Sequence, residues 1–225
     1  MDITETRDLG SINSIKALSA KKPTYPSKVV HSDTVIPMFK SLNKTNMQTH
    51  LEYFTTFHNR YYKSPFGAQS CRWLINLINE TLVETGADHY GITVKPFIHP
   101  WDQFSIIVNI PGKSDSLVVL GAHQDSVNHL EPIIGRAPGA DDDGSGTMTT
   151  LETLRVLLSS KDILEGNAEN TIEFHWYSGE EGGLMGSRKL FEAYEKDGKD
   201  VKAMLQTDSK YSFGHMSTSI CLATH

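Results

Sequence analysis

The sequence feature that most constrains the fold is a regular alternation of helix-like and strand-like segments after Asp143. Helices are predicted at 146–158 and 184–195, and strands at 171–177 and 201–206. Strands that alternate with helices in this way form βαβ crossovers with parallel strands. We therefore expect an α/β fold with a mixed, mostly parallel central sheet and helices on both faces.

The first half of the chain carries both kinds of pattern. Apolar residues at helical spacing predict helices over about 43–62 and 68–85, with Asn43 near the N-cap of the first and Gly86 ending the second. Further strands are predicted at 92–97, 104–110 and 117–120. We expect the sheet to contain both groups of strands.

Composition excludes several classes of protein. Hydrophobic residues make up 38% and charged residues 21% of the chain, and the formal net charge is -6, so no basic footprint for nucleic acid is present. No apolar run approaches the roughly 20 residues that a membrane-spanning helix needs. Cys71 and Cys221 form no recognisable disulfide or zinc framework, and we expect buried thiols. A monomeric globular protein without nucleic-acid or membrane partners is predicted.

A first polar cluster, Gly121 to Asp125, directly follows the predicted strand at 117–120. His123 could offer a neutral imidazole to a metal ion, and Asp125 lies on the same side of an extended chain, where it could accept the other ring N–H. Taken alone, the pair fits a hydrogen-bonded strand end at least as well. Both interpretations stay open at this point.

A second cluster holds the carboxylates of Asp141, Asp142 and Asp143 between glycines. A bound cation would relieve the repulsion between such close like charges. The alternative is an acidic helix start in which Asp143 caps the helix and favours its dipole. The alternative does not easily account for all three carboxylates.

A third cluster, Ser178 to Gly183, places Glu180 and Glu181 between a strand and a helix. Side chains of adjacent residues diverge at a strand end, so one carboxylate could bind a metal while the other acts as a general base. The alternative is that the two glutamates only interact favourably with the dipole of the helix that follows. The flanking glycines would leave room for a substrate backbone.

The clusters gain weight from their common position. Each follows a predicted strand, and Asp208 follows the strand at 201–206. Open α/β sheets bind their ligands at the carboxyl ends of the strands. His, Asp, Glu-Glu and Asp at successive strand ends therefore predict a metal site.

The chain resembles the zinc aminopeptidases of the bacterial and fungal leucine aminopeptidase type, and most closely their secreted fungal branch. The resemblance runs from about residue 25 to Asp208 and lies in the segments GAHQDS, APGADDDGSG, SGEEGGLMGS and VKAMLQTD, together with FHNRYY and IPGK. It implies two zinc ions that share an aspartate. It also implies peptide substrates from which an apolar N-terminal residue, such as leucine, is removed.

The resemblance also assigns roles to residues of this chain. The shared aspartate falls on Asp142, with His123 and Asp208 completing one zinc site and Glu181 binding the other zinc ion. Glu180 would be the general base that activates a zinc-bound water, and Asp125 would orient His123. The family holds its second zinc with a further histidine far downstream, which we expect this chain to lack. His215 or His225 is a poor substitute because a flexible tail rarely reaches the required geometry.

The resemblance ends at Asp208, where the sequence continues with Ser209-Lys210-Tyr211-Ser212. We therefore expect a leader or residual prosegment at 1–24, the N-terminal part of a catalytic domain at 25–208 and a tail at 209–225 unrelated to the family. The sheet would then be incomplete at its C-terminal side.

The resemblance implies a secreted glycoprotein that is made as a zymogen. The opening residues do not look like a secretory signal, which needs a basic start and an apolar run. The triplets Asn43-Lys44-Thr45 and Asn79-Glu80-Thr81 fit the pattern of N-glycosylation acceptors. Such triplets also occur by chance.

Two other functions are compatible with the same motifs. A one-zinc enzyme of the glutaminyl cyclase type would use this scaffold for acyl transfer without peptide hydrolysis. A truncated product without catalysis would only bind peptides or partners. The intact His123 and the pair Glu180-Glu181 favour the peptidase.

Overall fold

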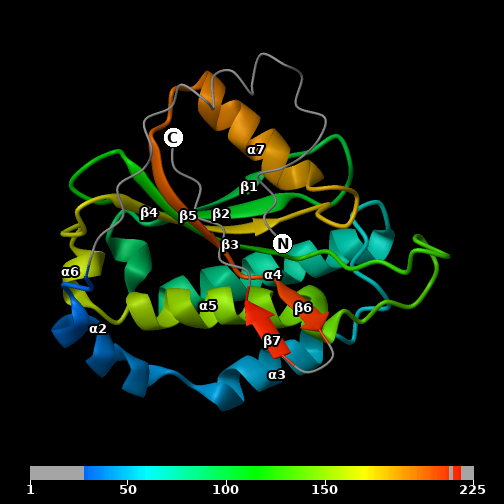
Figure 1. The fold of residues 1–225 in the computed structure, drawn as a ribbon, viewed down its shortest axis with the longest axis horizontal. Helices are drawn as coiled ribbons and strands as arrows, with labels where there is room; N and C mark the ends of the chain where they lie inside the picture. Colours follow the sequence, from blue (N-terminus) through cyan, green and yellow to red (C-terminus); the bar gives the residue numbers. More distant parts are fainter. Residues whose placement is uncertain (1–27, 213–214, 219–225) are drawn as a thin grey trace.

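A five-stranded sheet lies at the centre of the computed structural model, which describes residues 28–212 and 215–218 (Figure 1). Its strands lie in the order β1-β2-β4-β3-β5. Their bounds are β1 (Thr93–Phe97), β2 (Ser105–Ile110), β3 (Leu117–His123), β4 (Thr171–Tyr177) and β5 (Val201–Gln206). Strand β4 pairs in parallel with β3, which pairs in parallel with β5, whereas β2 is antiparallel to both β1 and β4. The mixed sheet with parallel later strands confirms the expected fold class.

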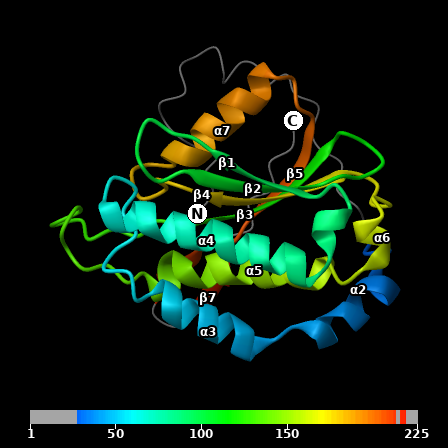
Figure 2. The same ribbon diagram turned by 180° about the vertical axis from the view of Figure 1, so that it is seen from behind.

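Helices cover both faces of this sheet (Figure 2). One face carries α4 (Pro65–Glu84) and α5 (Gly146–Leu157), with α3 (Lys44–Phe54) packed against α5, and the other face carries α7 (Met185–Lys196). Because helices cover both faces of the sheet, β4 is buried along most of its length, including its polar residues Glu173 and His175.

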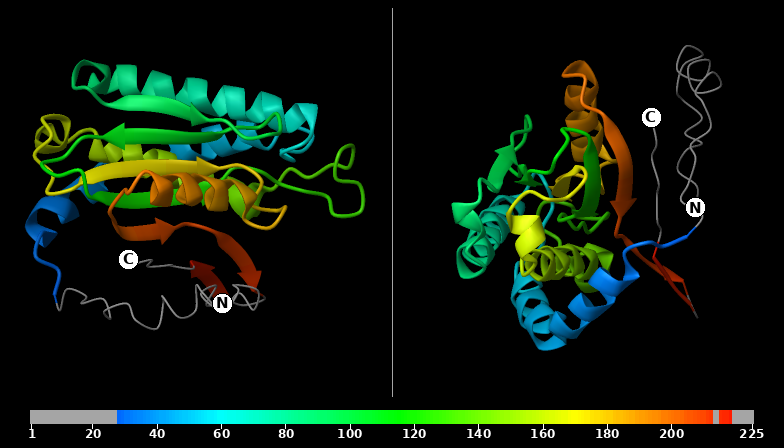
Figure 3. Two further views of the ribbon diagram at one scale, coloured as in Figure 1. Left: turned by 90° about the horizontal axis from the view of Figure 1, so that it is seen from above. Right: turned by 90° about the vertical axis from the view of Figure 1, so that its left-hand side faces the viewer.

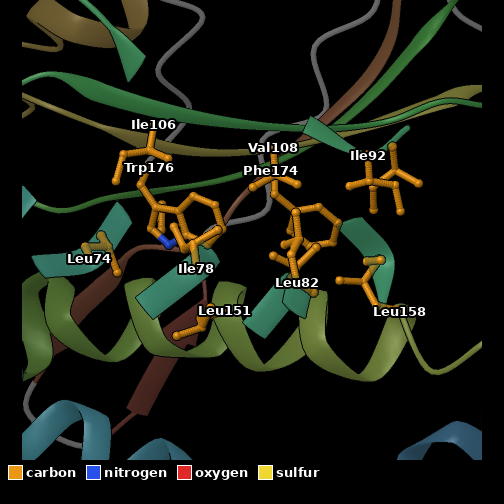
Figure 4. Close-up of a cluster of buried hydrophobic side chains, with 14 of the residues drawn as sticks. Leu74, Ile78, Leu82, Ile92, Ile106, Val108, Leu151, Leu158, Phe174 and Trp176 are labelled. Atoms are coloured by element: carbon orange, nitrogen blue, oxygen red, sulfur yellow. The ribbon is translucent and has the colours of Figure 1, made fainter. Parts of the chain in front are cut away.

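The larger hydrophobic core lies between the sheet and the pair α4 and α5 (Figure 4). Trp176 and Phe174 from β4 contribute its largest fully buried apolar side chains, and Ile78 and Leu151 meet them from the two helices. A smaller cluster under α7 contains Leu117, Val119, Tyr177, Leu190, Tyr194 and Val201. Because the strand ends are anchored from both faces, the residues that follow them start from fixed positions.

The register of the parallel strands brings the predicted clusters to one edge. His123 on β3 pairs with Tyr177 on β4, and Gly121 pairs with Gln206 on β5. The chain therefore leaves all three strands at the same edge of the sheet. The loop that follows β3 projects beyond this edge (Figure 3).

Some predicted boundaries were wrong. The helix expected at 43–62 ends at Phe54, and α4 begins at Pro65 with the Ser64 side chain accepting the N–H of Gly67. Between these helices Asn59 and Arg60 are fully buried and bond to distant backbone, which an uninterrupted helix would not allow. Asn43 does cap α3, because its side chain accepts the N–H of Asn46.

Several short elements were not predicted from sequence. They are α2 (Ser32–Met38), η1 (Phe39–Ser41), η2 (Ala87–His89), η3 (Ala140–Ser145), α6 (Lys161–Leu164) and the hairpin of β6 (Ser209–Ser212) and β7 (His215–Thr218). Strand β6 lies beside η3, which carries the aspartate triplet.

The remaining predictions concern the chain's ends and its cysteines. The predicted leader at 1–24, Cys221 and His225 lie outside the described residues. Cys71 is buried, as expected, and burial raises the pKa of its thiol to about 11. Within the described part of the chain, no helix is both long and apolar enough to cross a membrane.

Candidate metal centre

Two strand ends and η3 bring three predicted ligands together, so the aspartate triplet does not itself follow a strand as expected. His123 is the last residue of β3, Asp142 lies in η3, and Asp208 follows β5 by two residues. One ligand atom from each lies within 4.8 Å of the other two. Glu181 is not part of this group.

The distances within this group fit a zinc ion. His123 Nε2 lies 3.0 Å from Asp142 Oδ1 and 3.8 Å from Asp208 Oδ1. Zinc bonds to nitrogen and oxygen are about 2 Å long, so two ligand atoms of a tetrahedral site stand roughly 3.3 Å apart. Imidazole and carboxylate are also ligand types that zinc accepts. His123, Asp142 and Asp208 could therefore hold zinc with little movement.

Contacts with Asp125 and Asp143 hold His123 in place. Its side chain is 1% exposed, its Nδ1 lies 3.5 Å from Asp125 Oδ1, and its backbone N–H donates to Asp143 Oδ2 at 3.1 Å. Burial disfavours a charge on the imidazole, but hydrogen bonds that the imidazole donates to three carboxylates, first that of Asp125, outweigh it and raise the pKa of His123 well above its usual value. The aspartates thus provide a strongly negative site that a cation would neutralise.

The aspartate triplet divides its tasks. Asp142 is 58% exposed at its side chain and faces His123. Asp143 is fully buried, and its carboxylate accepts the N–H groups of His123 and Gly146, where α5 begins. Burial raises the pKa of Asp143 well above its usual value. The two interpretations of the triplet therefore apply to different residues, with Asp143 at the helix start and Asp142 at the candidate metal site.

The adjacent glutamates diverge after β4. Asp125 accepts the backbone N–H of Glu180 at 3.0 Å and that of Glu181 at 3.2 Å, so one carboxylate holds both residues. Glu180 Oε2 lies 3.9 Å from His123 Nε2, whereas Glu181 Oε2 lies 3.7 Å from His129 Nε2. Only Glu180 therefore faces the group built around His123.

The pKa values of both glutamates are raised above the ordinary value for this side chain. Burial is the main cause of the raised pKa of Glu180, with Asp125 and Asp208 adding to it and His123 opposing it. Burial and the charge of Asp142 raise the pKa of Glu181 to about 7. A carboxyl whose pKa is raised toward neutrality is suited to exchange protons with a substrate or water.

The glycines around this pair have a local structural reason. Gly179 and Gly183 have φ angles of +69° and +102°, which side chains rarely adopt. A Cβ at Gly182 would lie 3.0 Å from the ring of Tyr62. Gly179 and Gly182 therefore allow the turn after β4 to pack against Tyr62, while a Cβ at Gly183 would meet nothing within 4 Å.

Sequence reasoning missed residues that the structure places beside the site. The buried Arg60 donates to the backbone of the loop after β3, and His129 in that loop faces Glu181. The FHNRYY segment carried part of the family resemblance, but nothing in it indicated that Arg60 reaches this loop. His129 stands in no recognisable motif.

Comparison with solved structures defines the class of fold. The LapA aminopeptidase of Legionella pneumophila is similar with a TM-score of 0.72 and 30% sequence identity, over 85% of this chain and 49% of that one. A glutaminyl cyclase from an Acidobacteriales bacterium has the same fold with a TM-score of 0.53 and 21% identity, over 84% of this chain and 62% of that one. The fold is that of the zinc exopeptidases.

The particular family follows from the sequence match. Residues 105–218 match the model of peptidase family M28, and the chain belongs to this family. The match ends inside the segment 209–225 that was expected to be unrelated to the family. The boundaries of the leader, domain and tail stay a prediction.

Fungal relatives are more similar in sequence. Leucine aminopeptidase 1 of Leptosphaeria maculans is 58% identical over 207 residues, which is 92% of this chain and 52% of that protein. Leucine aminopeptidase 1 of Sclerotinia sclerotiorum is 55% identical over 92% of this chain and 53% of its own length. The chain spans about half the length of these curated relatives.

Proposed function

We propose that this chain contributes the zinc-binding and proton-transferring part of an aminopeptidase that removes apolar residues such as leucine from peptide N-termini. The observation that carries the proposal is the convergence of His123, Asp142 and Asp208 beside Glu180 at one edge of the sheet. Membership of peptidase family M28 and the similarity to proteins named leucine aminopeptidase 1 support it.

In this proposal the residues of the chain divide two tasks. His123, Asp142 and Asp208 hold a zinc ion, and Glu181 contributes to a second one. Zinc, when bound, would polarise the scissile carbonyl and make a water molecule more acidic. Asp125 keeps His123 and the backbone of both glutamates in place, because its carboxylate contacts all three residues.

Glu180 is proposed as the general base. Its carboxylate takes a proton from the attacking water as the carbonyl carbon is attacked, and then delivers that proton to the leaving amine. Its position 3.9 Å from His123 Nε2 places it beside the proposed zinc rather than among the ligands.

The test uses the chain as it stands. Zinc per chain is measured by elemental analysis, and release of leucine from a leucyl anilide is followed with and without added zinc. We expect zinc-dependent release, and a loss of roughly 100- to 10,000-fold in Glu180→Gln because a general base contributes about that much. Glu169→Gln is the matched control, since Glu169 is exposed before β4, at the opposite end of that strand. A chain that binds no zinc and releases no leucine contradicts the proposal.

Two other outcomes would identify a different protein. One zinc per chain with cyclisation of an N-terminal glutamine, and no release of leucine, would support the glutaminyl cyclase alternative. Peptide binding that Glu180→Gln leaves unchanged, without turnover, would indicate a protein that only binds. The single group of three ligand atoms found among the described residues keeps the one-zinc alternative worth testing.

Secretion and glycosylation belong to the same proposal. Asn43 and Asn79 are both exposed, so either could accept a glycan if the chain entered the secretory pathway. Peptides would be the only partners of a monomeric enzyme. Mass spectrometry of the natural product before and after deglycosylation would test this part.

A further inference from the structure

The buried Arg60 joins the two segments that carry the candidate metal ligands. Its side chain is fully buried, and its guanidinium donates to three backbone carbonyls. Nε reaches Gln124 O at 2.9 Å, directly after His123, and Nη2 reaches Gly139 O at 2.9 Å, three residues before Asp142, while Nη1 donates to Pro138 O. One rigid group therefore spans the distance between the end of β3 and η3.

The residues beside Arg60 hold the same loop, which we call the 126–139 loop. The Arg60 N–H donates to Ser126 Oγ, which in turn donates to Ala137 O. Asn59 donates to Ile133 O and to Gly135 O. The segment 58–60 thus determines the path of the loop between His123 and Asp142.

The contact between Arg60 and Gly139 is too close for a side chain. Gly139 has a φ of +52°, and a Cβ built there would lie 2.7 Å from Arg60 Nη2. The same Cβ would lie 2.5 Å from Asp142 O and 2.6 Å from Ser126 Cβ, so the loop can pack this closely against Arg60 and its own neighbours only with glycine at this position.

Arg60 also connects to the strand end that carries the glutamates. Its carbonyl accepts an N–H from Gln103 Nε2, and Gln103 accepts from Ser178 Oγ through both its backbone and its side chain. Ser178 is two residues before Glu180. All three clusters at the edge of the sheet therefore contact Arg60 directly or through one residue.

The charge of Arg60 suits its surroundings. Burial lowers the pKa of its guanidinium to about 10, and the nearby carboxylates, first that of Asp125, limit this decrease. Arg60 is therefore still charged at neutral pH. It places a fixed positive charge under carboxylates that repel one another until a cation binds.

We propose that Arg60 is a positioning residue of the metal site, which sets the separation of His123 and Asp142 before zinc binds. Lysine could supply the charge but not the planar fork of donors that reaches three carbonyls. The role rests on the proposed zinc site, and it predicts an effect on zinc affinity beyond any effect on folding.

The experiment measures the zinc dissociation constant of the purified chain by competition with a chelating dye, and its thermal midpoint without zinc. Arg60→Lys should raise the dissociation constant about 10-fold and Arg60→Met about 100-fold, the range found when partners of metal ligands are removed. Zinc-free Arg60→Lys should also exchange the amide hydrogens of the 126–139 loop faster than the wild type.

Arg155 provides the matched control. It is a part-buried arginine in the last turn of α5 that pairs with Glu152 at 2.6 Å and donates to the carbonyl of Ser41, so it links helix and loop without facing the site. Arg155→Lys and Arg155→Met should lower the thermal midpoint and leave the zinc dissociation constant unchanged.

The outcomes separate the two proposals. A wild-type chain that binds no zinc overturns the metal site and this role with it. Wild-type binding that Arg60→Lys and Arg60→Met leave unchanged overturns the role of Arg60 alone, as do equal shifts in the Arg60 and Arg155 variants. If Arg60→Met does not fold, the comparison of Arg60→Lys with Arg155→Lys decides.

Discussion

His123 and Glu181 lie at the same edge of the sheet in different surroundings. The side chain of His123 is 1% exposed, and carboxylates from three segments face it. The side chain of Glu181 is 17% exposed, and it faces His129, which is 77% exposed. On the first side of the site, His123 itself is enclosed by the protein, although Asp142 beside it is 58% exposed, whereas on the second side Glu181 faces the loop after β3.

The difference has a structural origin. His123 belongs to β3, whose register is fixed by pairing with β4 and β5, and Asp208 follows β5 by two residues. Glu181 lies in a turn, and His129 lies in the projecting loop (Figure 3). Ligands at paired strand ends are in place before a metal binds, but ligands on loops must be ordered on binding, which costs conformational entropy. We therefore expect the His123 side to bind zinc more tightly than the Glu181 side.

The largest expected effect is that of His123→Ala. It removes one of the three ligands on the His123 side, so zinc affinity there should fall more than roughly 100-fold. Removal of a residue that only contacts a ligand costs up to roughly 100-fold. Isothermal titration with zinc would measure this loss. The tighter of the two binding phases is assigned to the His123 side, so Glu181→Ala should leave it unchanged. A tight phase that persists in His123→Ala would contradict this assignment.

Asp125→Asn tests what the two sides share. The Asp125 carboxylate accepts two backbone N–H groups from the glutamates and faces His123 Nδ1. The amide keeps the shape of the side chain but loses the charge and one acceptor. Zinc affinity should fall about 10- to 100-fold at the His123 side. Zinc titration with circular dichroism as a check of the fold measures it, and an unchanged affinity would show that Asp125 is not needed there.

The sequence predicts the first side of the site better than the second. The strand at 201–206 has the predicted bounds, and β3 begins at the predicted Leu117 but continues to His123, three residues past the predicted end at 120. His123 is the last residue of β3 and Asp208 follows the strand at 201–206, so local patterns were enough to indicate a site.

Long-range contacts explain what the sequence does not reveal. Arg60 lies in a segment whose apolar spacing predicts a helix, yet its guanidinium bonds to carbonyls far along the chain. The approach of His129 to Glu181 likewise depends on the path of a loop. Neither is encoded in the spacing of neighbouring residues, and both require the folded sheet.

The stability of the chain without zinc should depend on pH, because two groups at the site titrate with raised pKa values. In the folded, metal-free chain the pKa of Glu181 is about 7, against an ordinary 4.5, so the fold favours its protonated form. The free energy of unfolding should then decrease as pH rises from about 4.5 to about 7. The raised pKa of His123 acts in the same direction, because its stabilisation is complete below the usual 6.5 and lost as pH rises through the folded value.

Zinc competes with these protons, so the increase in Tm on adding zinc should be larger at pH 8 than at pH 5.5. Differential scanning calorimetry at both pH values measures it. Glu181→Gln removes one of the titrating groups and should reduce the difference. An increase in Tm that is the same at both pH values would argue against this account.

The smallest expected effect is that of His129→Ala. Its imidazole lies 3.7 Å from Glu181 Oε2 but is 77% exposed. Exposed ion pairs contribute about 0–1 kcal/mol, which corresponds to at most a fivefold change in affinity. His89→Ala is the control, because His89 is 81% exposed beside Asp88, away from the site. A much larger loss of zinc in His129→Ala than in His89→Ala would show that His129 is a ligand, and the second side would then be more complete in this chain than its exposure indicates.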